Sequence, residues 1–155
     1  MTYIRYLHVL AAAAWIGEVI VINFVLIPFV SSLSAETKKI VIQKLFPRIF
    51  RLASVLAATT AVCGYVYLFY IAKGNFSFLF NSQRGIFLFI GALLGTLLTL
   101  FHFFMENKMA HKIGISDEKE EMIDDIHLRL KIVPRVGLLV ITTIFICMMI
   151  SVRGL

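Results

Sequence analysis

The chain has little charge, few cysteines and almost no proline for its length. Charged residues make up 15% of its 155 residues, where an average soluble domain has about 25%. It contains three prolines and two cysteines, and both cysteines, Cys63 and Cys147, lie inside apolar runs. The low charge excludes an ordinary soluble domain and a disordered chain, and the isolated cysteines exclude a scaffold held by disulfide bonds.

Motifs for nucleotide binding and hydrolysis are missing as well. The chain has no Walker phosphate loop, no GxGxxG fingerprint, no GxSxG elbow and no HExxH zinc motif. Its net charge of +6 does not indicate nucleic-acid binding, because the basic residues lie between long apolar runs. In that position they report membrane orientation. We therefore expect the lipid bilayer as a partner, and no nucleic acid.

Long apolar runs dominate what is present. A helix needs about 20 apolar residues to cross a bilayer core, and four runs reach that length, over residues 3–30, 48–72, 85–105 and 133–152. The first is too long for the ~7 to 15 apolar residues of a signal peptide and is expected to be retained. We predict an all-α integral membrane protein in which residues 1–155 form a single domain, an antiparallel four-helix transmembrane bundle.

The three connections between these runs differ in polarity. Residues 31–47 begin with polar side chains and end at Pro47, beside the start of the second helix. Residues 73–84 are short and aromatic, like a loop at the level of the lipid headgroups. Residues 107–131 are strongly polar and predict a turn near Gly114, an N-cap at Ser116 and a short amphipathic helix.

Basic residues are distributed unevenly between the two sides of the predicted bundle. The first and third connections, with the helix ends beside them, hold eleven of the fifteen Lys and Arg residues, and the opposite side holds Arg5, Lys73, Arg84 and Arg153. By the positive-inside rule both termini face outward, N-out and C-out, in the cytoplasmic (inner) membrane of a multi-pass protein.

Small and polar residues predict which helix faces meet. Helices in lipid associate through close contacts between small residues and through polar contacts. Gly91 and Gly95 are four residues apart in the third helix, and His102 lies on the same stripe. The first helix has an equivalent stripe at alternating steps of three and four residues, formed by His8, Ala11, Trp15, Glu18 and Ile22.

Glu18 lies near the middle of the first helix, where a carboxylate costs at least ~2.5 to 3.5 kcal/mol. Helix rise places Glu18 roughly 22 Å and His102 roughly 26 Å from the outer boundary. One hypothesis is a protonated Glu18 satisfied by a hydroxyl or a backbone carbonyl. The other is a polar pair with His102 or with Arg51 that also serves proton movement.

His8 lies one to two turns from the outer surface, on one face with Trp15. Cys147, Met148 and Met149 of the fourth helix and Cys63 of the second helix reach about the same depth. Histidine with methionine is an axial pair for heme, and histidine with cysteine and methionine suits copper(I). A histidine that reaches the headgroups beside ordinary apolar fillers is the simpler interpretation.

The other histidines do not complete a bis-histidine heme site with His8. His102 differs from His8 by roughly 20 Å in depth, so the two cannot bind one iron. His111 and His127 lie in the third connection, where we expect them to be solvated.

A sequence pattern accompanies His8: the first helix reads YLHVLAAAAWIGEVIVINFVLIPFV, with Trp15, Gly17 and Pro28 after the histidine. LFPRIFRLA enters the second helix, LTLFHFFMENKMA closes the third, and VRGL ends the chain. This pattern resembles the CopD-like superfamily of four-helix membrane proteins, which includes copper-resistance D proteins and HemJ-type protoporphyrinogen oxidases. The resemblance implies heme or porphyrin chemistry at His8, with Trp15 and Gly17 as an adjoining packing motif.

The chain departs from this family at two positions. Glu18 stands where relatives usually have a second glycine, and Gly91 stands where they carry a lysine, with Arg84 the nearest basic residue. The missing lysine argues against porphyrinogen oxidation, and whether the chain is an enzyme stays open.

The resulting hypothesis is a membrane-embedded heme b or redox component of the CopD-like type. His8 is then an axial ligand, Met148, Met149 or Cys147 supplies the second ligand, Trp15 packs beside the cofactor, and Glu18 and His102 form an inner polar pair. A copper-handling protein that uses His8, Cys63, Cys147 and Met148 is one alternative, and a cofactor-free accessory subunit is another. A membrane redox partner or quinone and a homo-oligomer are compatible with each of them.

The charge distribution predicts the topology directly. A reporter that is active only in the cytoplasm should be inactive when it is fused after Leu155. The eleven basic residues lie at the opposite end of the bundle, and the positive-inside rule places that end in the cytoplasm. The same reporter inserted between Ser34 and Ala35 should be active. Activity of the C-terminal fusion would contradict the predicted orientation.

Overall fold

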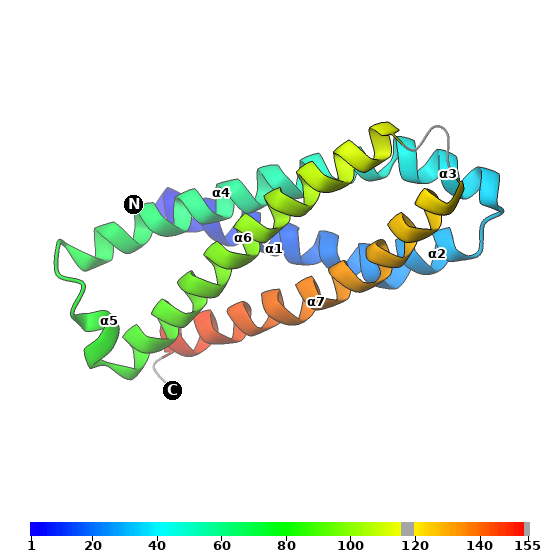
Figure 1. Cartoon of the computed structure of the whole chain (residues 1–155). Helices are drawn as coiled ribbons and strands as arrows, with labels where there is room; N and C mark the ends of the chain where they lie inside the picture. The colour runs from blue at the N-terminus through cyan, green and yellow to red at the C-terminus, as the bar shows by residue number, and fades with distance from the viewer. Residues whose placement is uncertain (116–119, 154–155) are drawn as a thin grey trace.

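The computed structural model describes residues 1–115 and 120–153, and over those residues it consists of helices and their connections, without strands. The four long helices are α1 (Thr2–Val21), α4 (Phe46–Ala72), α6 (Gln83–Ile115) and α7 (Glu120–Arg153). Short helices complete the chain: η1 (Ile22–Leu26) and α2 (Ile27–Ser31) continue α1, and α3 (Ala35–Lys44) and α5 (Phe78–Asn81) lie in the connections. Both termini lie at one end of the bundle and α3 lies at the other (Figure 1).

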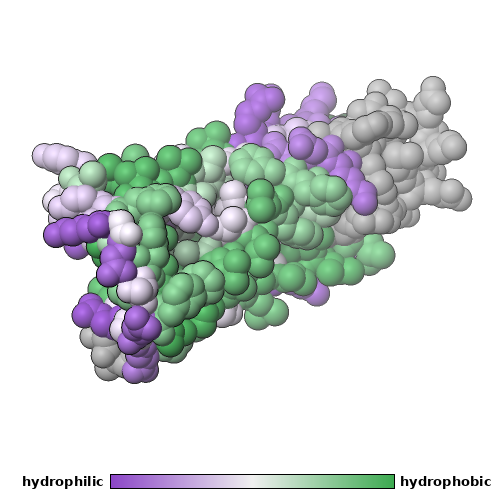
Figure 2. All heavy atoms as spheres, turned by 60° about the vertical axis from the view of Figure 1, so that its left-hand side comes forward, coloured by the Kyte–Doolittle hydropathy of each residue, from purple (hydrophilic) through white to green (hydrophobic). Residues whose placement is uncertain are grey.

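Four segments are long and apolar enough to cross a membrane: Thr2–Ser31, Ala35–Ala72, Gln83–Lys108 and Lys131–Val152. Figure 2 shows apolar side chains across the middle of the molecule and hydrophilic ones gathered at the near end and toward the opposite end. The predicted all-α four-helix membrane bundle is thereby confirmed, and the chain is a multi-pass membrane protein.

The helices are arranged as a ring. The most extensive contacts join α6 to α7 and α1 to α4, and contacts of α4 with α6 and of α1 with α7 close the ring. Each helix therefore packs between two antiparallel neighbours. Two apolar clusters fill the interior: Trp15, Ala53, Ala57 and Ile141 in the middle, and Val30, Ile42 and Phe46 toward α3.

The first membrane segment contains one turn of π-helix. The N–H of Ile27 bonds to the carbonyl of Ile22 across this turn, and Pro28 follows directly. A proline in a regular helix has no N–H to donate and clashes with the carbonyl four residues earlier. A wider turn before Pro28 relieves that clash, which is a common origin of π-bulges and kinks.

One connection contains a helix that the sequence analysis did not predict, and one expectation about the connections is wrong. Residues 31–47 contain α3, because AETKKIVIQK has good helix formers, Glu36 in the first turn and Lys44 in the last. The polar segment before the fourth span is not a separate short helix, because α7 runs unbroken through Pro134. A proline is tolerated inside a membrane helix where neighbouring groups satisfy the backbone around it. Asn23 contacts α7 at this level, with its amide donating to the carbonyl of Pro134. The predicted cap at Ser116 lies outside the described residues.

The end of the bundle that carries the termini is closed by α5 and Arg84. The side chain of Arg84 donates hydrogen bonds of 3.0 Å to the carbonyls of Ser151 and Val152, which neutralises part of the negative end of α7. The turn α5 packs directly onto the start of α6 at Gly85. A Cβ on Gly85 would collide with the Phe78 carbonyl and lie 2.8 Å from Leu79 Cα.

Replacing Gly85 with alanine should therefore destabilise the bundle by about 1 to 3 kcal/mol, because the backbone of α5 must move. Gly95→Ala in the same helix is the matched control, since a Cβ there meets nothing within 4 Å. Thermal unfolding of both variants in detergent checks this difference. Equal melting temperatures would contradict the proposed collision.

Candidate functional site

A cavity of about 90 Å³ lies in the interior of the bundle, between the two apolar clusters. All four long helices line it. One end of the wall is formed by Trp15, Ala53, Leu98 and Ile141. The other end is formed by Ile22, Phe50, Glu106 and Val133. Because the chain alternates direction, the first set faces the end with the termini and the second faces α3. The wall is mostly apolar, and its titratable side chains are Glu18, His102 and Glu106.

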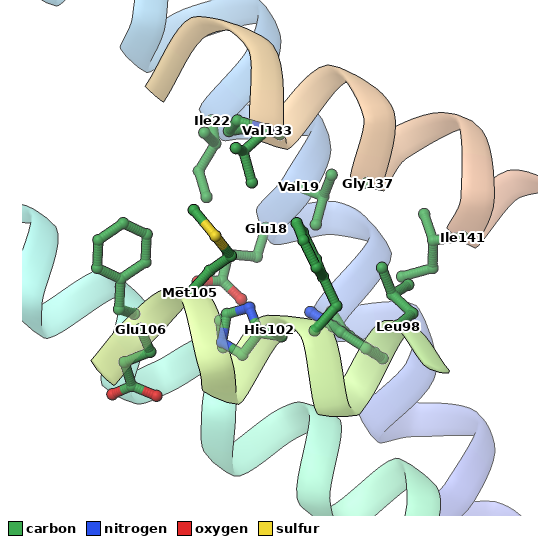
Figure 3. A pocket seen from close by; sticks show the side chains of 15 residues that line it. Glu18, Val19, Ile22, Leu98, His102, Met105, Glu106, Val133, Gly137 and Ile141 are labelled. Atoms are coloured by element: carbon green, nitrogen blue, oxygen red, sulfur yellow. The ribbon is translucent and has the colours of Figure 1, made fainter. Parts of the chain in front are cut away.

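Glu18 is the most unusual member of this wall. Both of its carboxyl oxygens are buried and have no hydrogen-bond partner among the described residues. The predicted pair with Arg51 is therefore not formed, and Arg51 is exposed. A direct hydrogen bond to His102 is not formed either, although both side chains line the same cavity and Glu18 points toward the imidazole ring (Figure 3).

The cavity has room for water between these two groups. A buried water needs a cavity of about 10 to 15 Å³, so a cavity of about 90 Å³ is large enough to hold water. Water that bridges two polar groups is enthalpically nearly as good as a direct hydrogen bond. The expected approach of Glu18 and His102 through one water is thus compatible with the geometry, and it stays a prediction.

His102 belongs to a second polar group on the α3 side of the cavity. Its Nε2 lies 3.2 Å from Ser54 Oγ of α4, and Ser54 Oγ donates a hydrogen bond to Glu106 Oε2. Trp15 meets the same imidazole edge-on, with ring centroids 6.3 Å apart. Sequence reasoning missed Ser54 and Glu106 as partners, although the four-residue spacing of His102 and Glu106 in one helix was a usable signal.

Asn23 is another polar residue that sequence reasoning missed. It is 9% exposed, and its amide nitrogen donates to the carbonyls of Val19 at 2.8 Å and of Pro134 at 2.9 Å. Its Oδ1 has no partner within the part of the chain that the structure describes. A polar residue in the middle of an apolar helix was the available signal. Its role is to fasten the π-helical turn to α7.

His8 packs against α4 near the termini. Its Nδ1 lies 2.8 Å from the carbonyl oxygen of Thr60, and because a carbonyl only accepts, Nδ1 carries the proton of this bond. In a neutral ring Nε2 then has a free lone pair. The ring lies directly over Gly64, where an added Cβ would come within 2.8 Å of Cε1, so Gly64 makes room for the histidine.

The structure does not gather the other predicted ligands around His8. Cys147 is buried and Met148 packs on α6, where their atoms would lie 3.6 and 2.8 Å from a Cβ on Gly91, whereas the contacts of His8 are on α4. Cys63 is half-buried, and Met149 is exposed. Among the side chains that the structure describes, which exclude residues 109–127, no three His, Cys, Asp or Glu converge on a point that could hold a metal ion. The side chains of His111 and His127 lie outside the described residues.

Comparison with known proteins gives one family. Residues 10–113 match the model of a domain of unknown function, DUF4149. The match covers more than half of the chain and includes Glu18, Ser54, His102 and Glu106, and it ends before α7 and begins after His8. No curated protein and no solved structure matches the chain.

Proposed function

The chain belongs to the DUF4149 family, and we propose that it is a membrane protein that takes up and releases protons at the buried cavity shared by Glu18 and His102. The observation that carries this proposal is the pair of buried, unpartnered oxygens of Glu18.

A carboxyl group in this position costs free energy, so a functional role would explain its presence. A charge near the middle of a membrane helix costs at least ~2.5 to 3.5 kcal/mol, and a buried acceptor without a donor adds a desolvation penalty. Among the side chains that the structure describes, no Lys or Arg lines the cavity to offset either cost, and His102 makes no direct hydrogen bond to Glu18. A Glu18 side chain that alternates between a neutral acid and a carboxylate solvated by water would explain both the buried glutamate and the cavity beside it.

His102 supplies a second proton-exchanging group within the same cavity. A neutral imidazole has one nitrogen that donates a proton and one that accepts a proton, which makes it a common partner for proton transfer. The ring is held in place by Trp15 and Ser54. An acid and a base that line one cavity with room for water are the groups that proton transfer requires.

Infrared difference spectroscopy between acidic and alkaline samples tests this function in the purified protein. We expect a buried carboxylic acid band that responds to pH and disappears in Glu18→Gln, because the amide keeps the shape and cannot titrate. Glu36→Gln, at an exposed residue of α3, is the control and should keep the band. A Glu18→Gln spectrum identical to that of the wild type would contradict the proposal.

A heme b or redox role is the second candidate, and one observation favours it. A metal-binding histidine typically donates its other ring N–H to a backbone carbonyl or a carboxylate, and His8 does so with Thr60. His8 Nε2 thus suits one axial position, where a bound heme would supply one-electron chemistry. The cavity near Glu18 does not fit a porphyrin, because sites for such ligands occupy about 300 to 1,000 Å³.

In the copper alternative the ligands are His8, Cys63, Cys147 and Met148. In the accessory-subunit alternative the protein binds no cofactor. In each case a redox partner, a quinone or a second copy of the chain would have to bind on the lipid-facing surface. The inner membrane as location and the outward termini belong to this proposal too, supported by the charge distribution.

The absorption spectrum and the metal content of the purified protein separate these candidates. We expect His8→Ala to lose any bound heme or metal while the bundle stays folded, because four packed spans do not depend on one half-buried side chain. His102→Ala is the control and should keep the cofactor. Full retention of heme or copper by His8→Ala would contradict a role for His8 as ligand, and a colourless, metal-free wild type would favour the accessory subunit.

A further inference from the structure

We propose that the cavity exchanges protons with one side of the membrane only, the side of α3, through a relay formed by His102, Ser54 and Glu106. This inference rests on the proposed function, since it describes the route by which protons reach Glu18.

The cavity is closed toward the end that carries the termini. The apolar cluster of Trp15, Ala53, Ala57 and Ile141 occupies that end, with Ala57 fully buried. Leu56, Leu98 and Leu138 pack around it. These side chains offer neither donors nor acceptors along the bundle axis, apart from the indole N–H of Trp15, which can donate but not accept. This cluster therefore offers no side-chain relay like the one on the α3 side of the cavity.

The opposite end contains a continuous chain of hydrogen bonds. Ser54 has a single hydroxyl proton, and it donates this proton to Glu106 Oε2. Ser54 Oγ must therefore accept in its contact with His102, and the proton of that 3.2 Å contact lies on Nε2. Both bonds point the same way, from the imidazole through the hydroxyl to the carboxylate.

Glu106 ends this chain where the apolar run of α6 gives way to polar residues. It lies one turn, about 6 Å, beyond His102 along α6, and Asn107 and Lys108 follow it in the sequence. Glu106 is half-buried and Lys108 is exposed. In Figure 3, Glu106 lies beyond the His102 ring as seen from Glu18, and its carboxylate points away from the cavity.

The titratable groups that face Glu18 are few, so the route has few alternatives. Among the side chains that the structure describes, α6 contributes His102 and Glu106, and α4 contributes Phe50 and Ala53 to the wall with the hydroxyl of Ser54 behind it. The described residues of α7 that line the cavity are apolar, and no described Lys or Arg lines it.

The proposed relay moves one proton from Glu18 to Glu106 in two stages. Glu18 releases its proton to water in the cavity, and the His102 ring takes up one proton from that water. The Nε2 proton passes to Ser54 Oγ while the original hydroxyl proton of Ser54 passes to ionised Glu106. The net result is one proton moved from Glu18 to Glu106, with no bond between heavier atoms formed or broken.

Proton-for-deuteron exchange at Glu18 tests the route. The protein in lipid vesicles is mixed with D₂O buffer, and the shift of the Glu18 carboxylic acid band is followed with time. We expect Ser54→Ala and Glu106→Gln to slow the exchange by about 100-fold, the usual size of a positioned acid–base contribution. Ser54→Thr, which keeps a hydroxyl, should restore the rate.

Thr99→Val is the matched control, because it removes another buried hydroxyl, one that bonds only to its own helix at Gly95. It should exchange at the wild-type rate. Wild-type exchange in Ser54→Ala would overturn the relay and leave the proposed function standing. A wild-type protein in which no band depends on Glu18 would overturn the proposed function itself, and the relay with it.

Sidedness is measured separately in vesicles with one protein orientation. A pH jump confined to the α3 side should change the Glu18 band as soon as the solutions have mixed. The same jump on the side of the termini should leave the band unchanged. An equal response from both sides would overturn the one-sided access.

Discussion

The constraint on which the interior depends is the Glu18 carboxyl group, which lies in an apolar bundle without a hydrogen-bond partner among the described residues. Glu18 cannot be packed like its apolar neighbours, because both of its oxygens would need donors that the surrounding helices do not offer. A cavity of about 90 Å³ lies beside Glu18, and the polar side chains of His102 and Glu106 also line it. The cavity is small enough to leave the helix contacts above and below it intact.

Close backbone approach elsewhere in the bundle sets the positions of those walls. Gly64 lets the His8 ring lie against α4, and Gly91 lets Met148 of α7 lie against α6. In lipid such contacts between small residues and larger side chains supply much of the association energy, since burial of apolar surface gains little there. Asn23 adds a polar contact between the first membrane segment and α7 at the turn that Pro28 distorts.

Two polar sites therefore lie at different levels of one bundle. His8 is held by Thr60 between α1 and α4 near the termini, and the Glu18 cavity lies deeper, among all four helices. The proposed proton exchange uses only the deeper site, and the heme or redox alternative uses His8. The His8→Ala and Glu18→Gln variants address the two centres independently, since their side chains belong to different clusters.

The sequence by itself determined the helical class, the four membrane segments and the inward stripe of Ala11, Trp15 and Ile22, because chain length per span and the helical period follow from composition and spacing alone. It also showed that Glu18 and His102 lie at similar depth, since helix rise converts residue number into distance. Only the tertiary structure decided which helices are neighbours, that Ser54 and Glu106 complete the polar group, and that Glu18 has no direct partner among the described residues. Ring order and side-chain contacts between helices depend on how four similar apolar surfaces pack, and residues far apart in sequence, such as Ser54 and Glu106, carry no local signal of that packing.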